Sequence, residues 1–243
     1  MINLVVKDLK KNFGGLHVLK GVSFEINGPE LIGLIGPNGA GKTTLTNVLD
    51  GAIKPNSGTV YLGGNRIDQL QPFQVARHGL GRTFQVTRSF RRMTVLENLM
   101  VPALALDQGL SRPEIDDKAM EVLEFLTVDH LRNEYAKSLS GGQQKLLELG
   151  RLLMLNPDVI ILDEPFAGVH PKLMEIIYKY IERVNNDGTA IILISHQMDS
   201  IFSLCKRLLV LNYGDLIADG TPDVVRNDPT VIEAYLGSDD EED

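Results

Sequence analysis

A glycine-rich segment between an apolar run and a helical pattern constrains this chain more than any other feature. Residues Gly36 to Thr43, which read GPNGAGKT, match the pattern G-x-x-x-x-G-K-[ST]. The apolar run Leu31 to Ile35 before them predicts a buried strand, and Thr43 to Leu49 after them predicts a helix. Glycines allow a tight loop whose N–H groups point at phosphate oxygens, and the helix N-terminus attracts the same anion. The sequence therefore predicts a phosphate-binding loop in an α/β fold.

Two side chains of this loop carry most of its expected chemistry. Lys42 would neutralise the β- and γ-phosphates of a nucleotide, and the Thr43 hydroxyl would ligate Mg²⁺. The alternative is a glycine-rich turn that binds no ligand. The position between a buried strand and a helix is the context that the phosphate-binding pattern requires, and it favours the first interpretation.

Further apolar runs indicate a sheet that is buried on both faces. They are short and not interrupted by polar residues, and they comprise Val159 to Leu162, Ile191 to Ile194 and Leu208 to Leu211. Runs of this kind belong in a parallel sheet covered by helices. We expect these segments and Leu31 to Ile35 to form the central strands.

Helical patterns fill most of the remaining chain. One helix is expected from Pro171 to Val184, ending near Gly188, and another has a face formed by Ile115, Ala119, Val122, Leu123 and Leu126. Residues 88–156 lack strand-like runs, so we expect an all-helical subdomain inserted into the α/β core. The predicted division is one domain over residues 1–236, with its core at 1–87 and 157–236, and an acidic, disordered tail at 237–243.

Charge and composition exclude several classes of protein. Five of the 32 acidic residues form the tail Asp239 to Asp243, so 27 remain against 24 Lys and Arg, and the net charge of −8 becomes −3. Neither value fits a general nucleic-acid-binding surface. Cys205 is the single cysteine, which rules out a disulfide framework and suits a reducing compartment. No apolar run reaches the roughly 18 residues of a membrane span, and we see no signal peptide, so we expect a cytoplasmic protein.

Two acids follow one of the predicted strands. Asp163 and Glu164 come directly after Val159 to Leu162, at the strand end where α/β sheets bind ligands. Asp163 is placed to hold Mg²⁺, directly or through water, and Glu164 to polarise an attacking water. Acids that merely cap a strand end are an equally common explanation of such a pair taken alone. The phosphate-binding loop favours the catalytic interpretation.

The segment Leu139-Ser140-Gly141-Gly142-Gln143, here called the signature segment, decides between these interpretations. Ser140 and Gln143 form a capping box at the start of an apolar helix that runs to Leu155 and is ended by Pro157. With the phosphate-binding loop and the two acids, the segment resembles the ATP-binding-cassette (ABC) family, whose signature is Leu-Ser-Gly-Gly-Gln. In that family the segment binds the γ-phosphate of ATP held by the opposite subunit.

The resemblance implies a P-loop NTPase (RecA-like) core, an inserted helical signature subdomain and an N-terminal antiparallel β region. It implies ATP and Mg²⁺ as cofactors, Glu164, His196 and Gln85 as catalytic residues, and Thr43, Gln85 and Asp163 as metal ligands. The implied nucleotide contacts are Phe13, which would stack on adenine, and Val18, Gly36, Pro37, Asn38, Gly39, Ala40, Gly41, Lys42, Thr43, Thr44, Ser140, Gly141, Gly142 and Gln143.

Several histidines and one departure from the family pattern also bear on the site. His196 resembles the switch histidine that contacts the γ-phosphate, whereas His17, His78, His130 and His170 have no metal-ligand spacing. The family usually has an aspartate in the loop after Glu164-Pro165, and this chain has His170 there. The missing acid bears on coupling between two sites and not on ATP binding.

Subfamily wording narrows the expected function. Three segments are similar to those of branched-chain amino-acid importer ATPases: 79–85, 93–98 and 167–171 (AGVHP). The lipopolysaccharide-export ATPase is a close relative of these proteins. The resemblance implies a dimer with a second cassette, membrane permease subunits, a substrate-binding protein if the system is an importer, and a location on the inner face of the membrane. Arg88 to Met93, here called the docking edge, is the candidate permease contact; an ordinary solvated helix start is the alternative. A lipid exporter, a soluble non-transport ABC protein and an unrelated P-loop NTPase remain alternatives.

Overall fold

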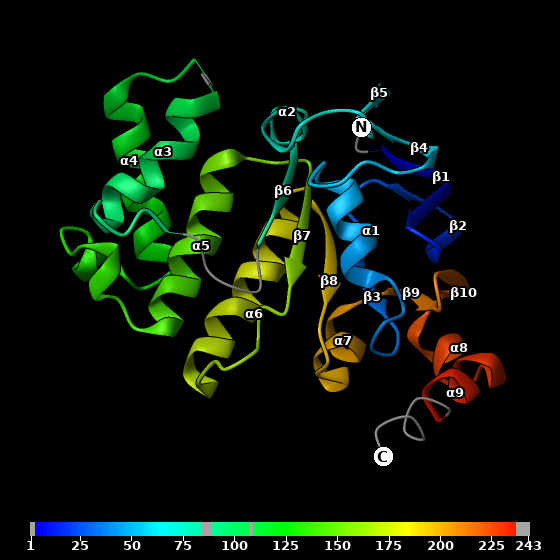
Figure 1. The fold of residues 1–243 in the computed structure, drawn as a ribbon. Coiled ribbons are helices and arrows are strands. Elements are labelled where there is room, and N and C mark those ends of the chain that lie inside the picture. The colour runs from blue at the N-terminus through cyan, green and yellow to red at the C-terminus, as the bar shows by residue number, and fades with distance from the viewer. Residues whose placement is uncertain (1–2, 84–88, 107–108, 237–243) are drawn as a thin grey trace.

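A six-stranded, mostly parallel sheet forms the centre of the protein. The computed structural model describes residues 3–83, 89–106 and 109–236 (Figure 1). The strand order is β10-β9-β3-β8-β7-β6, and all neighbours pair in parallel except β9 and β10. The strands are β3 (Leu31–Ile35), β6 (Leu80–Arg82), β7 (Val159–Asp163), β8 (Ala190–Ile194), β9 (Arg207–Asn212) and β10 (Asp215–Gly220).

The four strands predicted from apolar runs are confirmed, and both faces of the sheet are buried. Leu31 and Ile35 of β3 pack into the apolar cluster beneath α5 and α6, whereas Ile32 and Leu34 pack into the cluster on the opposite face. Successive side chains of a strand point to opposite faces, so a strand covered on both sides must be apolar throughout. This is why the runs read as continuous apolar sequence.

An antiparallel sheet covers the second face, as the fold prediction expected. Its order is β2-β1-β4-β5, with β1 (Asn3–Phe13), β2 (Leu16–Asn27), β4 (Ser57–Leu62) and β5 (Asn65–Arg66). Helix α1 (Lys42–Leu49) contributes Leu45, Val48 and Leu49 to the core between the two sheets. The phosphate-binding loop therefore begins at the end of a buried strand and ends on a buried helix.

Helices cover the other face of the central sheet and the C-terminal edge. They are α6 (Pro171–Asn186), α7 (Met198–Leu204), α8 (Pro222–Arg226) and α9 (Pro229–Leu236). Helix α2 (Pro72–Arg77) lies beside β6 instead and buries Val75 in the cluster between the two sheets. The predicted helix from Pro171 is confirmed, and its end at Asn186 agrees with the predicted stop near Gly188. Asn185, in its last turn, ties this end to neighbouring segments, because its side-chain amide donates to Thr189 O at 3.0 Å and to Pro29 O at 2.9 Å.

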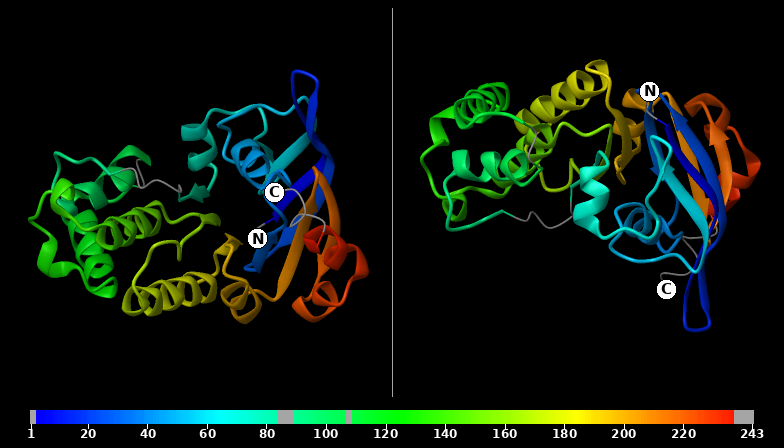
Figure 2. Two further views of the ribbon diagram at one scale, coloured as in Figure 1. Left: turned by 60° about the horizontal axis from the view of Figure 1, so that its bottom comes forward. Right: turned by 90° about the horizontal axis from the view of Figure 1, so that it is seen from above.

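The region predicted to be helical contains α3 (Val95–Leu106), α4 (Arg112–Phe125) and α5 (Gly141–Leu155), with the short 3₁₀ turns Asp129–Leu131 and Ala136–Ser138. All five residues of the predicted apolar face are buried: four lie on α4, and the fifth, Leu126, directly follows it. Figures 1 and 2 show α3 and α4 at the end of the molecule opposite the antiparallel sheet, and α5 lies between them and the central sheet. The boundaries of a separate subdomain stay a prediction, and the tail 237–243 lies outside the described residues.

Within the described ranges, no helix combines the length and the apolar character that crossing a membrane requires.

Candidate functional site

The phosphate-binding loop needs glycine at positions where another residue would collide with the chain. Gly36 has φ 147°, and a Cβ there would lie 2.0 Å from the carbonyl oxygen of Leu211. Gly41 has φ 106°, and its Cβ would lie 3.0 Å from Val18 O. The loop is also tied to the turn after β9, because the Gly214 N–H donates to Ala40 O at 3.0 Å. The motif therefore fixes a loop with close backbone approach on both sides.

The Lys42 side chain is folded over this loop. Its ammonium donates to Gly36 O at 2.5 Å and to Pro37 O at 2.9 Å. Partial burial lowers the pKa of Lys42, and the nearby carboxylates of Glu164 and Asp163 oppose that shift. The ammonium thus lies over the loop, near Asp163 at the end of β7 and Glu164 directly after it.

One cavity of about 320 Å³ brings together most of the residues predicted for the nucleotide. We call it the nucleotide cavity, and its lining consists of Val18, Asn38, Gly39, Ala40, Gly41, Lys42, Thr43, Thr44, Asp163, Glu164, Ile194 and His196. Gly36 and Pro37 are buried in the floor of the loop. The order β3-β8-β7 places the ends of these strands side by side, which is where α/β sheets bind ligands.

Glu164 has an unusual backbone and a partly desolvated side chain. Its φ is 49°, and its N–H donates to Ile194 O at 2.9 Å. The carboxylate is 13% exposed, and Oε1 lies 3.5 Å from His196 Nε2. Burial raises the pKa of Glu164, His196 opposes the rise, and Asp163 adds to it. A carboxylate of raised pKa is a better proton acceptor, which suits a general base.

Asp163 is held from two sides by consecutive residues at the end of β6. Its Oδ2 accepts from Arg82 Nη2 at 3.0 Å, and its N–H donates to Thr83 Oγ1 at 2.9 Å. Thr43 lines the same cavity and offers a hydroxyl oxygen. Among the described residues, no cluster of three or more His, Cys, Asp or Glu could hold a metal alone. Two oxygen donors with open positions fit Mg²⁺, which usually binds one or two protein oxygens together with substrate phosphates.

The signature segment lies apart from the nucleotide cavity of its own chain. Ser140 and Gly141 are exposed, and the capping box is present: the Gln143 N–H donates to Ser140 Oγ at 3.4 Å and the Ser140 N–H to Gln143 Oε1 at 2.9 Å. None of the segment's residues is part of the cavity lining in the described structure. The two predicted parts of the site are thus present in one chain but are not brought together by it.

Three predicted positions need separate comment. Phe13 ends β1 with 49% of its surface exposed, and Lys11 Nζ lies 5.1 Å from the centre of its ring. It does not line the nucleotide cavity, whereas Val18 does. Gln85 lies outside the described residues. His170, at the position of the missing aspartate, caps α6 by accepting the Lys172 N–H on Nδ1 at 3.3 Å.

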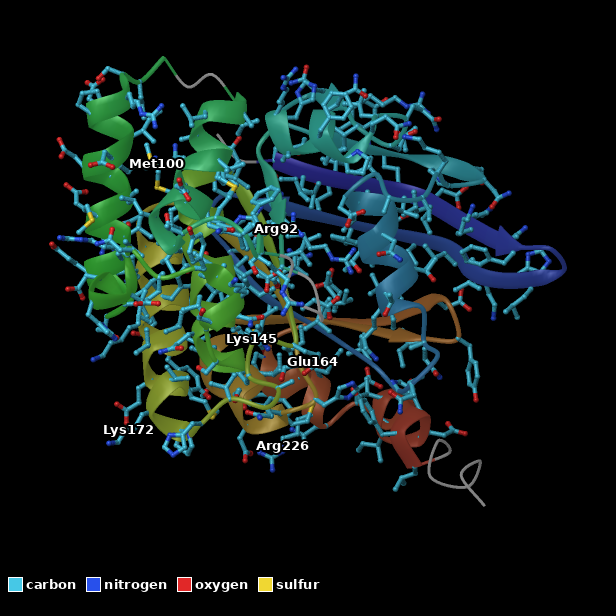
Figure 3. The ribbon with its side chains drawn as sticks, turned by 60° about the vertical axis from the view of Figure 1, so that its left-hand side comes forward. Arg92, Met100, Lys145, Glu164, Lys172 and Arg226 are labelled. Carbon is cyan, nitrogen blue, oxygen red and sulfur yellow. The ribbon has the colours of Figure 1, made fainter. Side chains whose placement is uncertain are left out.

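Two positively charged residues of the site were missed by sequence reasoning. Arg82 pairs with Asp163, as described above. Lys145, on α5, donates to Glu164 O at 2.6 Å and to Ala167 O at 3.4 Å, and Figure 3 shows Lys145 beside Glu164. Lys145 is 8% exposed, and burial lowers its pKa. No sequence signal marked Lys145, because the same helix also carries Glu148 and Arg151.

Three features together define a P-loop ATPase of the cassette type. They are a phosphate-binding loop after a strand of a mostly parallel sheet, two acids at the end of a nearby strand, and a capped signature helix. A family model described as "ABC transporter" matches residues 19–167, and one described as "Branched-chain amino acid ATP-binding cassette transporter" matches residues 216–241. The chain therefore belongs to the ABC transporter ATP-binding family, and it is an ATPase subunit.

Relatives of known name agree with this assignment over nearly the whole chain. The chain is 40% identical to the high-affinity branched-chain amino acid transport ATP-binding protein LivG of Salmonella typhimurium, covering 96% of this chain and 97% of LivG. It is 37% identical to the lipopolysaccharide export system ATP-binding protein LptB of Escherichia coli K12, covering 98% and 99%. The ADP conformation of MJ1267, an ATP-binding cassette of an ABC transporter, matches with a TM-score of 0.84 and 36% identity, covering 98% and 99%.

Proposed function

We propose that this chain hydrolyses ATP in the nucleotide cavity to drive an amino-acid importer in a cell membrane. The observation that carries the proposal is the convergence of Lys42, Thr43, Asp163, Glu164 and His196 on one cavity. A phosphate-binding loop without the acids would bind a nucleotide but would lack a base. The presence of both supports hydrolysis.

Each residue has a role that follows from its chemistry. Loop N–H groups and Lys42 would bind the β- and γ-phosphates, and Thr43 and Asp163, with Gln85, would hold Mg²⁺. When bound, the metal neutralises phosphate charge as the leaving group departs. Glu164 would accept a proton from the attacking water. His196 would contact the γ-phosphate and orient the Glu164 carboxylate 3.5 Å away. Phe13 and Val18 would contact the base and sugar side of ATP.

The separation of the signature segment from the nucleotide cavity supports a dimer. We propose that Ser140, Gly141, Gly142 and Gln143 of one subunit bind the γ-phosphate of ATP held by its partner, at the N-terminus of α5. The dimeric structure of MJ0796, a bacterial ABC transporter cassette, matches this chain with a TM-score of 0.81 and 26% identity, covering 90% of this chain and 98% of that one. ATP would favour the closed pair and hydrolysis would reopen it.

Glu164→Gln tests the assignment of the base. The amide keeps the shape of the carboxylate but is a poor proton acceptor, so we expect ATP binding to remain, turnover to fall by at least about 10²-fold, and an ATP-bound dimer to accumulate. The measurements are ATPase activity, fluorescent-ATP binding and light scattering, with the exposed Glu175→Gln as control. Parental turnover in Glu164→Gln would remove the general-base assignment.

Ser140→Arg tests the shared site. The larger, charged side chain at the exposed helix start should leave ATP binding by the monomer intact and block ATP-dependent dimerisation. Ser138→Arg, at an exposed position two residues earlier, is the matched control. Both substitutions are made in the Glu164→Gln background, and dimerisation is followed by light scattering. If Ser140→Arg dimerises at the same ATP concentration as the Glu164→Gln protein, the shared site is contradicted.

The docking edge and a cavity next to it support contact with permease subunits. In the described part of the edge, Arg91 and Arg92 are exposed, and Phe90 is 44% exposed with Arg151 Cζ 5.0 Å from its ring centre. A mainly apolar cavity of about 380 Å³, here called the docking cavity, lies between α2, β6, α3 and α5. We propose that a cytoplasmic segment of the permease, carrying acidic and apolar side chains, occupies both. Cross-linking of the assembled transporter that avoids residues 89–93 would remove this assignment.

The cargo assignment depends on the relatives. Identity to LivG and the match of residues 216–241 support branched-chain or other amino acids, and similarity to LptB leaves lipid export as the second candidate. For an importer, a substrate-binding protein would deliver the cargo, and the ATPase would lie on the cytoplasmic face of the membrane. Purification of the permease complex and its reconstitution in vesicles separates the candidates: ATP-driven leucine uptake supports import, and ATP-driven lipid extraction supports export.

A further inference from the structure

Arg82 joins two elements of the nucleotide site that are distant in sequence. It is the last residue of β6, and its side chain is 6% exposed. Nη1 donates to Asp50 Oδ2 and Asn47 Oδ1, both at 2.7 Å, and Nη2 donates to Asp163 Oδ2 at 3.0 Å. A planar guanidinium fixes the direction of each of these bonds, which a lysine ammonium cannot do.

The two partner regions have different positions in the site. Asn47 belongs to α1, the helix that begins at Lys42 of the phosphate-binding loop, and Asp50 caps the end of that helix. Asp163 ends β7 and lines the nucleotide cavity. Through Arg82, the direction of the Asp163 carboxylate therefore depends on the position of α1.

The residue after Arg82 completes the support. Thr83 is 3% exposed; its hydroxyl accepts the Asp163 N–H at 2.9 Å, and its own N–H donates to Ile161 O at 2.9 Å. Arg82 thus holds the side chain of Asp163 and Thr83 holds its backbone. A carboxylate fixed at both points has little freedom to rotate away from the cavity.

The Arg82 side chain also borders the docking cavity. Together with Asp50 and apolar residues of α2, α3 and α5, it lines the docking cavity. One buried side chain therefore separates the docking cavity from the carboxylate of the nucleotide cavity. If β6 shifted against α1 at the docking cavity, the Arg82 guanidinium, which donates a hydrogen bond to the Asp163 carboxylate, would move with it.

We propose that Arg82 is a positioning residue that directs the Asp163 carboxylate toward bound nucleotide and links it to the docking cavity. The inference rests on the proposed function, because it takes Asp163 as the metal-binding carboxylate. Partners of metal-binding carboxylates contribute through orientation, and their loss commonly weakens metal binding 10- to 100-fold. The effect of losing Arg82 should appear in the metal dependence of nucleotide binding.

The test measures fluorescent-ATP binding by the full chain in EDTA and across a Mg²⁺ titration. In Arg82→Met, we expect the dissociation constant in EDTA to stay within about twofold of the parent and the Mg²⁺ concentration for half-maximal enhancement to rise at least about tenfold. Arg82→Lys keeps the charge without the planar fork and should show a smaller rise; it decides the question if the methionine variant does not fold.

Arg66→Met is the matched control, because Arg66 also pairs with a buried acid, Asp68, at 2.9 Å, but in the antiparallel sheet outside both cavities. It should lower the melting temperature and leave the Mg²⁺ dependence unchanged. A purely structural role for Arg82 would make its variants behave like Arg66→Met, and that result overturns the inference alone. Failure of the parent to bind ATP overturns the proposed function as well.

Discussion

Lys145→Met examines how α5, the helix that Ser140 caps, supports the loop from Glu164 to Ala167 after β7. The substitution keeps a long apolar stem and removes the ammonium that donates to Glu164 O at 2.6 Å and Ala167 O at 3.4 Å. A charged hydrogen bond is worth about 1.5–3 kcal/mol, and we count the shorter bond in full and the longer one as weak. Releasing a buried ammonium from its desolvation penalty offsets part of the loss.

The expected net loss of stability is about 2 kcal/mol, which corresponds to a fall of about 4–8 °C in melting temperature for a chain of this size. Glu164 also has φ 49°, a conformation that the surrounding contacts must hold. We therefore expect kcat to fall about tenfold, a barrier increase of about 1.4 kcal/mol. KM for ATP should stay within about twofold, because Lys145 does not line the nucleotide cavity.

The assays are urea unfolding followed by circular dichroism and steady-state ATP hydrolysis well below the melting temperature. The control is Lys172→Met on α6, an exposed lysine that Figure 3 shows away from Lys145 and Glu164; it should change neither quantity. A Lys145→Met protein within 0.5 kcal/mol of the parent and with parental kcat would refute the reasoning, since the shorter carbonyl contact alone is worth more than that limit.

Three further predictions concern the loop, the pH dependence of stability and the thiol. Gly36→Ala should weaken ATP binding more than Gly39→Ala in a fluorescent-ATP titration, because both glycines have positive φ but only the Gly36 Cβ would meet a backbone oxygen, at 2.0 Å; equal effects would contradict this. Burial opposes ionisation of Asp68, but hydrogen bonds from Arg66, Val60 and Gln69 outweigh this effect and lower the pKa of Asp68 below 3.8. The contribution of Asp68 to the free energy of unfolding should therefore be present above pH 3.8 and lost as the pH falls through the lowered pKa. Asp68→Asn should flatten that part of the stability–pH curve. Burial raises the pKa of Cys205 to about 12, so native protein at pH 8 should resist iodoacetamide until urea unfolds it, and rapid native alkylation would refute this.

The fold was predictable where one local pattern determines the structure. The strand, loop and helix around Gly36 to Lys42 are contiguous, and their conformation follows from glycine, buried apolar residues and a helix N-terminus. The end of α6 at Asn186 agrees with the predicted stop near Gly188, but the contact of the Asn185 side chain with Pro29, 156 residues away, was not predictable. Contacts of that kind leave no periodic pattern in the sequence.

The same limit separates the predicted site residues from the missed ones. Asp163 and Glu164 were predicted because they follow an apolar strand. The residues that hold them are distant in sequence: Arg82 lies 81 positions from Asp163, and Lys145 lies 19 positions from Glu164. Each support required a known sheet order or helix packing. Phe13 was predicted from resemblance, and its place at an exposed strand end beside Lys11 leaves adenine stacking as a prediction.

The two adjacent acids are supported from different directions, which suggests how one site could respond to two partners. Asp163 is held by Arg82, whose side chain also lines the docking cavity. Glu164 is contacted through its carbonyl by Lys145, five residues along the helix that Ser140 caps, and Ser140 is proposed to bind the partner subunit's ATP. Displacement by the permease would therefore act first on metal orientation, and engagement of the signature segment on the base.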